Sequence, residues 1–300
     1  MVQIGSSMKL VTFSTGGDPR VGVVDADAGE VRDVSALLPA GADVAQVIEG
    51  WAQWAPVLAE RAPALTALAL DDVRLHAPIV PRRDVFCVGK NYREHVAEFG
   101  RSGYDSPDRS EALPEHPVVF SKATTSVTGP FDDVLAHPGV TSELDYEAEL
   151  AVVIGTGGRG ISREAAFDHV WGYTIVDDVT ARDLQRRHKQ WLIGKSLDTH
   201  CPMGPYAVSA DEIGDVTALQ VESRVNGEAR QSAPVKDLIF DIPELIATLS
   251  AAITLLPGDV IATGTPAGVG IGFDPPRFLA PGDVVEVSIT GLGTQRNRIV

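Results

Sequence analysis

Short apolar runs separated by Gly, Asp and Pro dominate the chain from residue 84 onward. Runs of this length, bounded by turn residues, are typical of β-strands. In this part of the chain, the few helices that the spacing of apolar residues predicts lie at about 162–170, 181–191 and 242–252. Many β runs with few helices predict an α+β, β-dominated fold rather than a doubly wound sheet. The expected strands are 84–89, 117–123, 146–155, 172–178, 205–209, 219–226, 259–264 and 283–290.

The first part of the chain has a different pattern. Residues 9–34 alternate short β-like runs with Gly and Asp turns. Residues 43–70 are rich in Ala and Leu with helical spacing, and Pro56 and Pro63 are expected to break or bound the helices. The proline-containing segment 75–84 is expected to link a small N-terminal domain to a larger one.

We therefore expect a small N-terminal α+β domain at 1–78 and a larger domain at 79–300.

A hydrophobic content of 44% and a charged content of 22% argue against disorder. The net charge of −16 disfavours binding to the phosphate backbone of nucleic acids. The chain contains no run of about 18 apolar residues, so the sequence predicts no membrane span. Two distant cysteines, Cys87 and Cys201, form no CxxC pair and fit a reducing cytoplasm.

Two glutamates, Glu147 and Glu149, interrupt an apolar run that ends at Gly155. Successive strand side chains alternate between faces, so the two carboxylates share one face. Burying two close carboxylates is costly unless a cation compensates their charge. The pair therefore indicates a divalent metal site, with a solvated face of an edge strand as the alternative.

Asp177 and Asp178 end the next apolar run and offer a third carboxylate. Alternation allows only one of them to point toward the glutamates. In the alternative interpretation, Asp178 and Thr180 cap a helix that begins near Ala181.

His95 and Glu98 are three residues apart, which places them on one face of a helical turn. A histidine held by a carboxylate can act as a general base near neutral pH. The alternative is an exposed His–Glu pair without a chemical role. The polar segment 100–116 that follows is turn-rich, and a loop of that length is often a lid over a functional site.

Two glycine-rich segments also bear on function. Residues 155–160 match the GxGxxG pattern of a dinucleotide-binding loop, with Asp177 about 20 residues downstream. Against this interpretation, the preceding strand carries two glutamates, whereas a central parallel strand is apolar on both faces. Residues 264–270 lack the GK[ST] ending of a phosphate loop and are expected to bring backbone N–H groups and Thr265 close to a ligand.

Together these segments resemble the fumarylacetoacetate hydrolase family. The similarity covers nearly all of 84–290 in separate blocks that keep their order, while 1–78 is loosely similar to the small N-terminal domain of many bacterial members. The blocks are GKNYREHVAE (89–98), PVVFSK (117–122), LDYEAELAVVIG (144–155), GYTIVDDVTARDLQ (172–185), GKSLDTHCPMGP (194–205), VNGEARQ (225–231) and LLPGDVIATGTPAGVG (255–270).

The resemblance implies a mixed β-roll catalytic domain, assembled as a cytoplasmic homodimer. It implies that Mg²⁺ or Mn²⁺ is held by Glu147, Glu149 and Asp178, although members commonly carry Asn-Asp where this chain has Asp177-Asp178. His200 stands where an aromatic or small residue is more usual. The remaining matches are His95 and Glu98 to the water-activating pair, Lys195 to a catalytic lysine, and Lys122, Arg182, Gln185 and Thr265 to groups that contact the substrate.

Substrates of the family share a 2-oxo acid end, so the implied partner is a small anionic 2-oxo acid. The implied reaction is hydrolysis of the C–C bond of an acylpyruvate, of the kind used in aromatic catabolism. His95 with Glu98 would activate water to attack the C4 carbonyl, and pyruvate would leave as an enolate stabilised by the metal. Lys195, Lys122 and Arg182 would hold the anionic substrate and the developing charge.

The same enolate chemistry also serves oxaloacetate decarboxylation, hydration of 2-oxo-pentenoates and isomerisation. A lyase of this kind is therefore the alternative to the hydrolase. A protein that only binds a metal or ligand would be expected to lack a carboxylate or the His–Glu pair, and this chain retains both.

Overall fold

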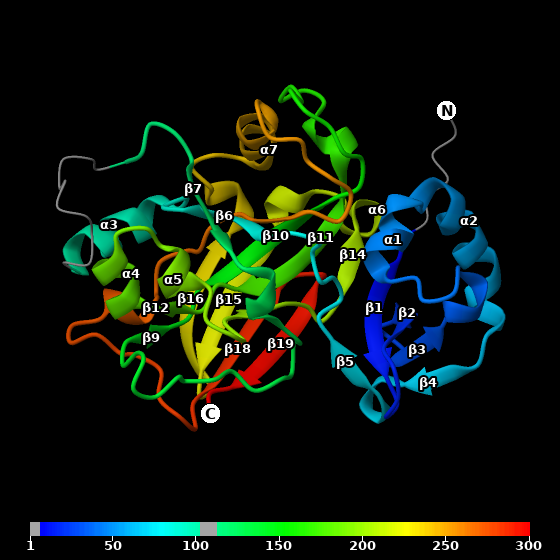
Figure 1. Ribbon diagram of the computed structural model, residues 1–300, viewed down its shortest axis with the longest axis horizontal. Coiled ribbons are helices and arrows are strands. Elements are labelled where there is room, and N and C mark those ends of the chain that lie inside the picture. Colours follow the sequence, from blue (N-terminus) through cyan, green and yellow to red (C-terminus); the bar gives the residue numbers. More distant parts are fainter. Residues whose placement is uncertain (1–6, 103–112) are drawn as a thin grey trace.

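The computed structural model describes residues 7–102 and 113–300 (Figure 1). Within this part of the chain, eleven strands form one long mixed sheet, in which β17 and β6 are parallel and the other neighbours antiparallel. From end to end the strands are β4 (Ala67–Ala69), β3 (Glu30–Asp33), β2 (Arg20–Asp25), β1 (Lys9–Ser14), β14 (Ala207–Ser209), β11 (Val170–Asp177), β10 (Ala148–Ile154), β17 (Val260–Ala262), β6 (Val85–Gly89) and β7 (Val118–Lys122), while β5 (Arg74–His76) pairs with β1.

The N-terminal strands extend the same sheet, because β1 pairs with β14. Two helices, α1 (Val44–Glu49) and α2 (Trp51–Arg61), accompany these strands at that end (Figure 1). Pro56 lies inside α2, so the expectation that it bounds a helix is wrong; burial of the helix's apolar side chains compensates for the one hydrogen bond that proline removes. Pro63 does lie beyond α2, in the turn that follows it. The segment expected as a linker begins inside β5.

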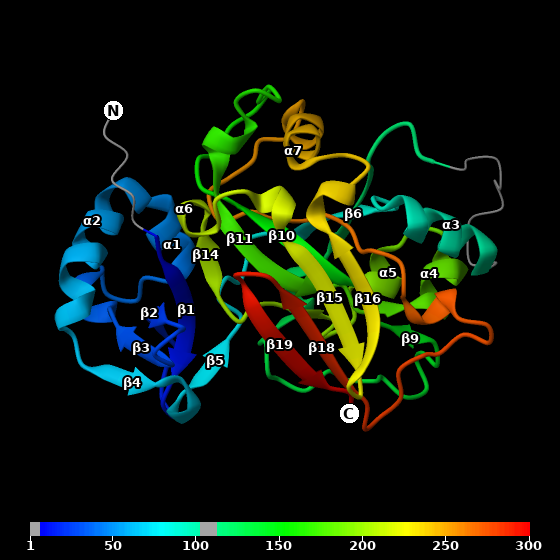
Figure 2. The same cartoon turned by 180° about the vertical axis from the view of Figure 1, so that it is seen from behind.

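β10 lies between two hydrophobic cores, and all its residues are buried. Its even-numbered side chains pack toward the second sheet, and odd-numbered Ala151 and Val153 share a core with α1 and β1. Figure 2 shows the second sheet in front of the long one. Its four strands, in order, are β16 (Glu228–Pro234), β15 (Gln220–Val225), β18 (Val284–Ile289) and β19 (Gly293–Arg298).

The expected strands are all present, and the turn between β15 and β16 has positive φ at Asn226 (52°) and Gly227 (79°), as a type I′ hairpin requires. The helix expected at 162–170 is wrong. Only a 3₁₀ turn, Ala166–His169, forms there, because β11 already begins at Val170. β19 was not predicted, since its buried positions are Gln295 and Asn297 rather than apolar residues.

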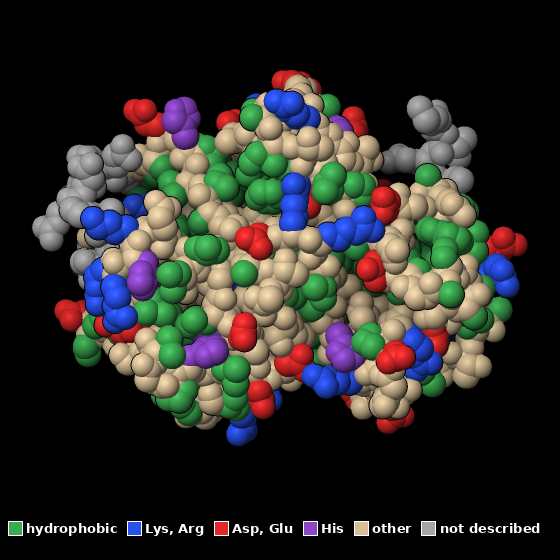
Figure 3. All heavy atoms as spheres, in the orientation of Figure 1, with side chains coloured by type: hydrophobic (Ala, Val, Ile, Leu, Met, Phe, Trp, Pro, Cys, Tyr) green, Lys and Arg blue, Asp and Glu red, His purple; other side chains and the backbone are tan. Residues whose placement is uncertain are grey.

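Helices α3 (Arg93–Ser102), α4 (Arg182–His188) and α5 (Leu192–Lys195) lie together near the β6–β7 end of the long sheet (Figure 1). The remaining elements are α6 (Ala210–Ile213), α7 (Ile242–Ser250), and two small ladders, β8 (Val127–Thr128) with β13 (Cys201–Pro202) and β9 (Leu144–Asp145) with β12 (Thr180–Ala181). Across the described ranges, none of the helices has the length and apolar character needed to cross a membrane. On the face shown in Figure 3, basic side chains lie in small groups interspersed with acidic ones.

Candidate active site

Three buried carboxylates meet where β10 and β11 run side by side. Glu147 immediately precedes β10, Glu149 is its second residue, and Asp178 directly follows β11. One oxygen from each lies within 4.8 Å of the others. The glutamates therefore share a buried face, as predicted, and the alternative of a solvated edge strand is wrong. Three oxygen donors at this spacing suit a hard divalent cation such as Mg²⁺ or Mn²⁺.

The adjacent aspartates have different surroundings. Asp178 is the one in the carboxylate cluster, as expected, whereas Asp177 Oδ1 accepts a hydrogen bond from the Glu147 backbone N–H at 2.8 Å. The capping alternative is wrong, because α4 begins after Ala181 without a side-chain cap. Thr180 donates its hydroxyl to the Asp178 carbonyl instead.

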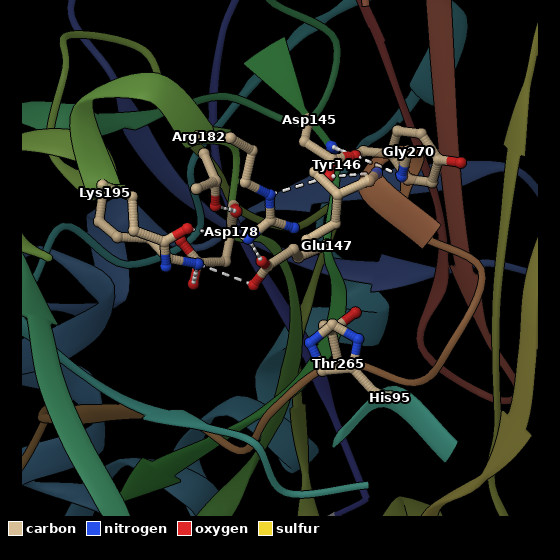
Figure 4. Close-up of polar contacts among 12 residues, drawn as sticks. His95, Asp145, Tyr146, Glu147, Asp178, Arg182, Lys195, Thr265 and Gly270 are labelled. Atoms are coloured by element: carbon tan, nitrogen blue, oxygen red, sulfur yellow. Dashed lines mark hydrogen bonds and ion pairs between the residues drawn. The ribbon is translucent and has the colours of Figure 1, made fainter. Parts of the chain in front are cut away.

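Three buried cations, Lys195, Arg182 and Lys122, contact the carboxylate cluster, and Figure 4 labels the first two. Lys195 Nζ donates to Glu147 Oε2 at 2.8 Å and to Asp178 Oδ2 at 2.7 Å. Arg182 Nη1 lies 2.7 Å from Glu147 Oε1. Lys122 Nζ donates to Asp178 Oδ1 at 2.7 Å and to the Val179 and Lys195 carbonyls, so it lies behind Asp178 and does not line the adjacent cavity.

Charge in this cluster is unevenly compensated. Burial would raise the pKa of Glu147, but Lys195 and Arg182 outweigh that effect and hold it at about 2. Burial raises the pKa of Glu149, and the carboxylates of Asp178 and Glu147 raise it further. The Glu149 side of the cluster is therefore where an added cation would relieve most repulsion, and this supports the fit of the three carboxylates to a metal.

A small cavity, open to solvent, borders the carboxylate cluster. Gln185 and Thr265 line it, but both are engaged: Gln185 Oε1 accepts from Arg182, and Thr265 Oγ1 donates to the Ala148 carbonyl. The other lining residues are Val88, Gly89, Lys90, His95, Phe120, Glu147, Glu149, Arg182, Trp191 and Lys195.

His95 reaches this cavity from α3, a separate element from those that carry the carboxylates (Figure 4). Its Nδ1 lies 3.3 Å from Glu98 Oε2, and both residues are buried, so the alternative of an exposed pair is wrong. Glu98 lies behind His95 and accepts the Gly268 backbone N–H at 3.0 Å. A carboxylate only accepts, so the His95 tautomer that suits this contact has its proton on Nδ1 and its basic nitrogen at Nε2.

The glycine-rich segments are also accounted for. β10 is antiparallel to both β11 and β17, so the loop 155–160 that follows it is not the phosphate-binding turn of a parallel dinucleotide fold. The 264–270 loop is tight, as expected, but several of its N–H groups bind protein carboxylates rather than point to a ligand. Gly264 N–H, for example, donates to Glu149 Oε2 at 2.8 Å.

The sequence patterns did not single out three residues of this site. Asp145 continues the Glu147/Glu149 alternation by one step, which was the available signal. Lys90 lines the cavity with a left-handed backbone, φ 56°, a conformation that non-glycine residues adopt mainly at special sites. Trp191 stacks edge-on against Phe120, with ring centroids 5.1 Å apart, and forms an apolar wall.

Two further features noted in the sequence are His200, whose role was left open, and the polar segment 100–116. His200 is buried, its Nε2 bonds the Leu135 carbonyl at 3.0 Å, and burial lowers its pKa to about 3, so it is a neutral residue that does not line the cavity. Most of the expected lid, residues 103–112 of 100–116, lies outside the described residues.

Both parts of the chain match models of known protein families, and whole proteins with similar sequences are also known. Residues 84–300 match the family model described as fumarylacetoacetate (FAA) hydrolase C-terminal, and 8–78 match one described as Rv2993c-like, N-terminal. The oxaloacetate tautomerase YisK of Bacillus subtilis is 57% identical over 233 residues, which cover 77% of this chain and 74% of that protein. The bovine mitochondrial oxaloacetate tautomerase FAHD2A is 38% identical over 304 residues, covering 99% and 93%.

A solved structure is also similar. The maleylpyruvate hydrolase of Sphingobium sp. SYK-6, in complex with manganese(II) ion and pyruvate, superposes with a TM-score of 0.79 at 31% identity. The match covers 98% of this chain and 99% of that one.

Proposed function

Because the chain belongs to the fumarylacetoacetate hydrolase family, we propose that it enolises a small 2-oxo dicarboxylic acid, with oxaloacetate interconverted between its keto and enol forms. The observation that carries the proposal is the position of His95, whose imidazole shares one small cavity with Glu147 and Glu149. Enolisation needs a base placed next to the site that binds the 2-oxo acid end of the substrate, so that the base can remove a proton from the neighbouring carbon. The two relatives named oxaloacetate tautomerases support this choice of substrate.

In the proposed mechanism, His95 Nε2 removes a proton from C3 of the substrate. Glu98 holds Nδ1 and stabilises the imidazolium that forms. Nε2 then returns the proton to the oxygen at C2, and the net change is a proton shift from carbon to oxygen. A divalent cation held by Glu147, Glu149 and Asp178 would supply Lewis-acid stabilisation of the developing charge. Lys195 remains protonated, because Asp178 and Glu147 outweigh the effect of burial and raise its pKa, and it adds positive charge nearby.

A second candidate is hydrolysis of an acylpyruvate, in which His95 would activate water instead of removing a proton from C3. The similarity to a maleylpyruvate hydrolase favours it, as does the buried His95–Glu98 pair. Decarboxylation of oxaloacetate would use the same site. Assembly as a cytoplasmic homodimer and preference for Mg²⁺ or Mn²⁺ remain part of the proposal; light scattering and metal titration would test the assembly state and the preferred metal.

Parallel assays of one preparation would separate these reactions. Enol-oxaloacetate decay is followed by its ultraviolet absorbance, decarboxylation by pyruvate formation, and hydrolysis with acetylpyruvate and maleylpyruvate, each with Mn²⁺ and with chelator. We expect tautomerisation to be the fastest reaction, to need the metal, and to fall about 10²–10⁴-fold in His95→Gln. The exposed His188→Gln is the matched control. Faster turnover of an acylpyruvate would replace the tautomerase proposal with the hydrolase.

A further inference from the structure

We propose that Asp145 is a positioning residue that couples the carboxylate cluster to the His95–Glu98 pair. Asp145 ends β9, is fully buried and lies two residues before Glu147. Its side chain does not line the cavity, so it acts through other residues rather than on substrate. The inference rests on the proposed function only in that the site catalyses a reaction of a 2-oxo acid.

Four donors converge on the Asp145 carboxylate (Figure 4). Oδ1 accepts the backbone N–H groups of Gly270 at 2.6 Å and Tyr146 at 3.0 Å. Oδ2 accepts Arg182 Nε at 2.9 Å and the Ile271 N–H at 3.1 Å. Because all four partners are donors, only a group with two accepting oxygens satisfies them. In an asparagine at this position, the side-chain NH₂ group would face two N–H donors and could not accept from them.

One branch of this network leads to the metal ligands. The guanidinium of Arg182 is planar and rigid, so fixing Nε also fixes Nη1. Nη1 contacts Glu147 Oε1 at 2.7 Å. Asp145 therefore sets the position of the cation that orients one carboxylate of the cluster.

The other branch leads to the base. Gly270 and Ile271 belong to a short 3₁₀ turn, Gly270–Gly272, next to Gly268, whose N–H donates to Glu98. A Cβ at Gly272 would collide with the Glu98 carboxylate, so this turn packs directly on the residue that holds His95. By anchoring the turn, Asp145 sets where the imidazole stands relative to the metal ligands.

Asp145→Asn tests the coupling through two readouts, Mn²⁺ affinity by titration calorimetry without substrate and kcat at saturating Mn²⁺. Substitution of residues that support metal ligands commonly costs about 10–100-fold in metal affinity or activity. We expect losses of this size in both quantities, with unchanged circular dichroism. The half-buried Asp183→Asn, next to Arg182 in the chain, is the control and should change neither.

Two further variants disturb the two branches. Arg182→Lys should weaken Mn²⁺ binding. Gly270→Ala, whose Cβ would lie 2.7 Å from Asp145 Oδ1 and collide with the Arg277 carbonyl, should lower kcat, and Mn²⁺ affinity should fall with it because the same carboxylate fixes Arg182. If Asp145→Asn does not fold, these two variants decide the question, and unchanged kcat in Gly270→Ala overturns the proposal.

A folded Asp145→Asn that loses only one of the two quantities would also overturn the coupling. Failure of the oxaloacetate assignment would be recognised separately, because Mn²⁺ affinity is measured without substrate. The kcat comparison uses whichever 2-oxo acid the wild-type protein converts.

Discussion

Replacing Asp177 with asparagine should stabilise the protein at pH 8 when a chelator keeps it free of metal, and should have little effect on its stability at pH 4. Burial raises the pKa of Asp177 from its ordinary 3.8 to about 7 in the folded protein. Folding therefore favours the protonated carboxyl. The stability that this protonation contributes is complete below about pH 4 and is lost as the pH rises through 7.

The size of the effect follows from the pKa shift. A rise from 3.8 to about 7 corresponds to roughly 4 kcal/mol at about 1.4 kcal/mol per pKa unit, which is an upper bound for a residue with charged neighbours. Asparagine is neutral at both pH values, and its side-chain oxygen can still accept the Glu147 N–H. We expect Asp177→Asn to raise the free energy of unfolding at pH 8 by about 1–4 kcal/mol.

Urea denaturation at pH 4 and pH 8 with chelator present measures this difference. The exposed Asp168→Asn is the matched control and should change stability equally little at both pH values. Added Mn²⁺ should reduce the gain, because a nearby cation favours the ionised carboxylate of the wild-type protein. Equal stability of Asp177→Asn and wild type at pH 8, or the same gain at both pH values, would refute the reasoning.

Three other substitutions probe the site. Glu149→Gln should abolish measurable Mn²⁺ binding in calorimetry, since it removes one of three carboxylate donors, and retained affinity would contradict the metal assignment. Lys90→Met should raise KM for oxaloacetate about ten- to hundredfold more than for a 2-oxo monocarboxylate, because Lys90 lines the cavity and the substitution removes a positive charge that favours the second carboxylate. Steady-state kinetics with both acids would contradict this if KM rose equally for the two. Gly89→Ala should lower stability by about 1–3 kcal/mol in urea melts, because its Cβ would collide with the Trp191 ring; wild-type stability would mean that the ring can move aside.

The local alternation of the chain predicted the strands and the shared face of Glu147 and Glu149 well, because strand geometry fixes which side chains lie together. It did not predict β19, whose buried positions are polar, or the absence of a helix at 162–170, where the start of β11 limits the space. Tertiary contacts decide such cases, and a local pattern does not contain them.

For the site, residue patterns singled out Glu147, Glu149 and His95, and the family resemblance added Lys195, Arg182, Gln185 and Thr265, all of which line the cavity. Lys90 and Trp191 were found only in the structure. Lys122 illustrates the limit of the sequence, because only the three-dimensional contacts reveal that its ammonium group is used behind Asp178 rather than on the cavity wall. The contacts of Asp145 with Gly270 and Ile271 join segments 125 and 126 residues apart, a separation at which one sequence gives no pairing signal.

The pairing of β1 with β14 has a consequence for shortened forms of the chain. Without residues 8–78, β14 would become an edge strand with one unpaired row of backbone N–H and C=O groups. Trp171, now covered edge-on by Trp51 with ring centroids 5.1 Å apart, would face water together with other members of its core. Exposed edges beside apolar surface promote intermolecular strand pairing. We therefore expect a chain without the N-terminal strands to aggregate more readily than the full chain.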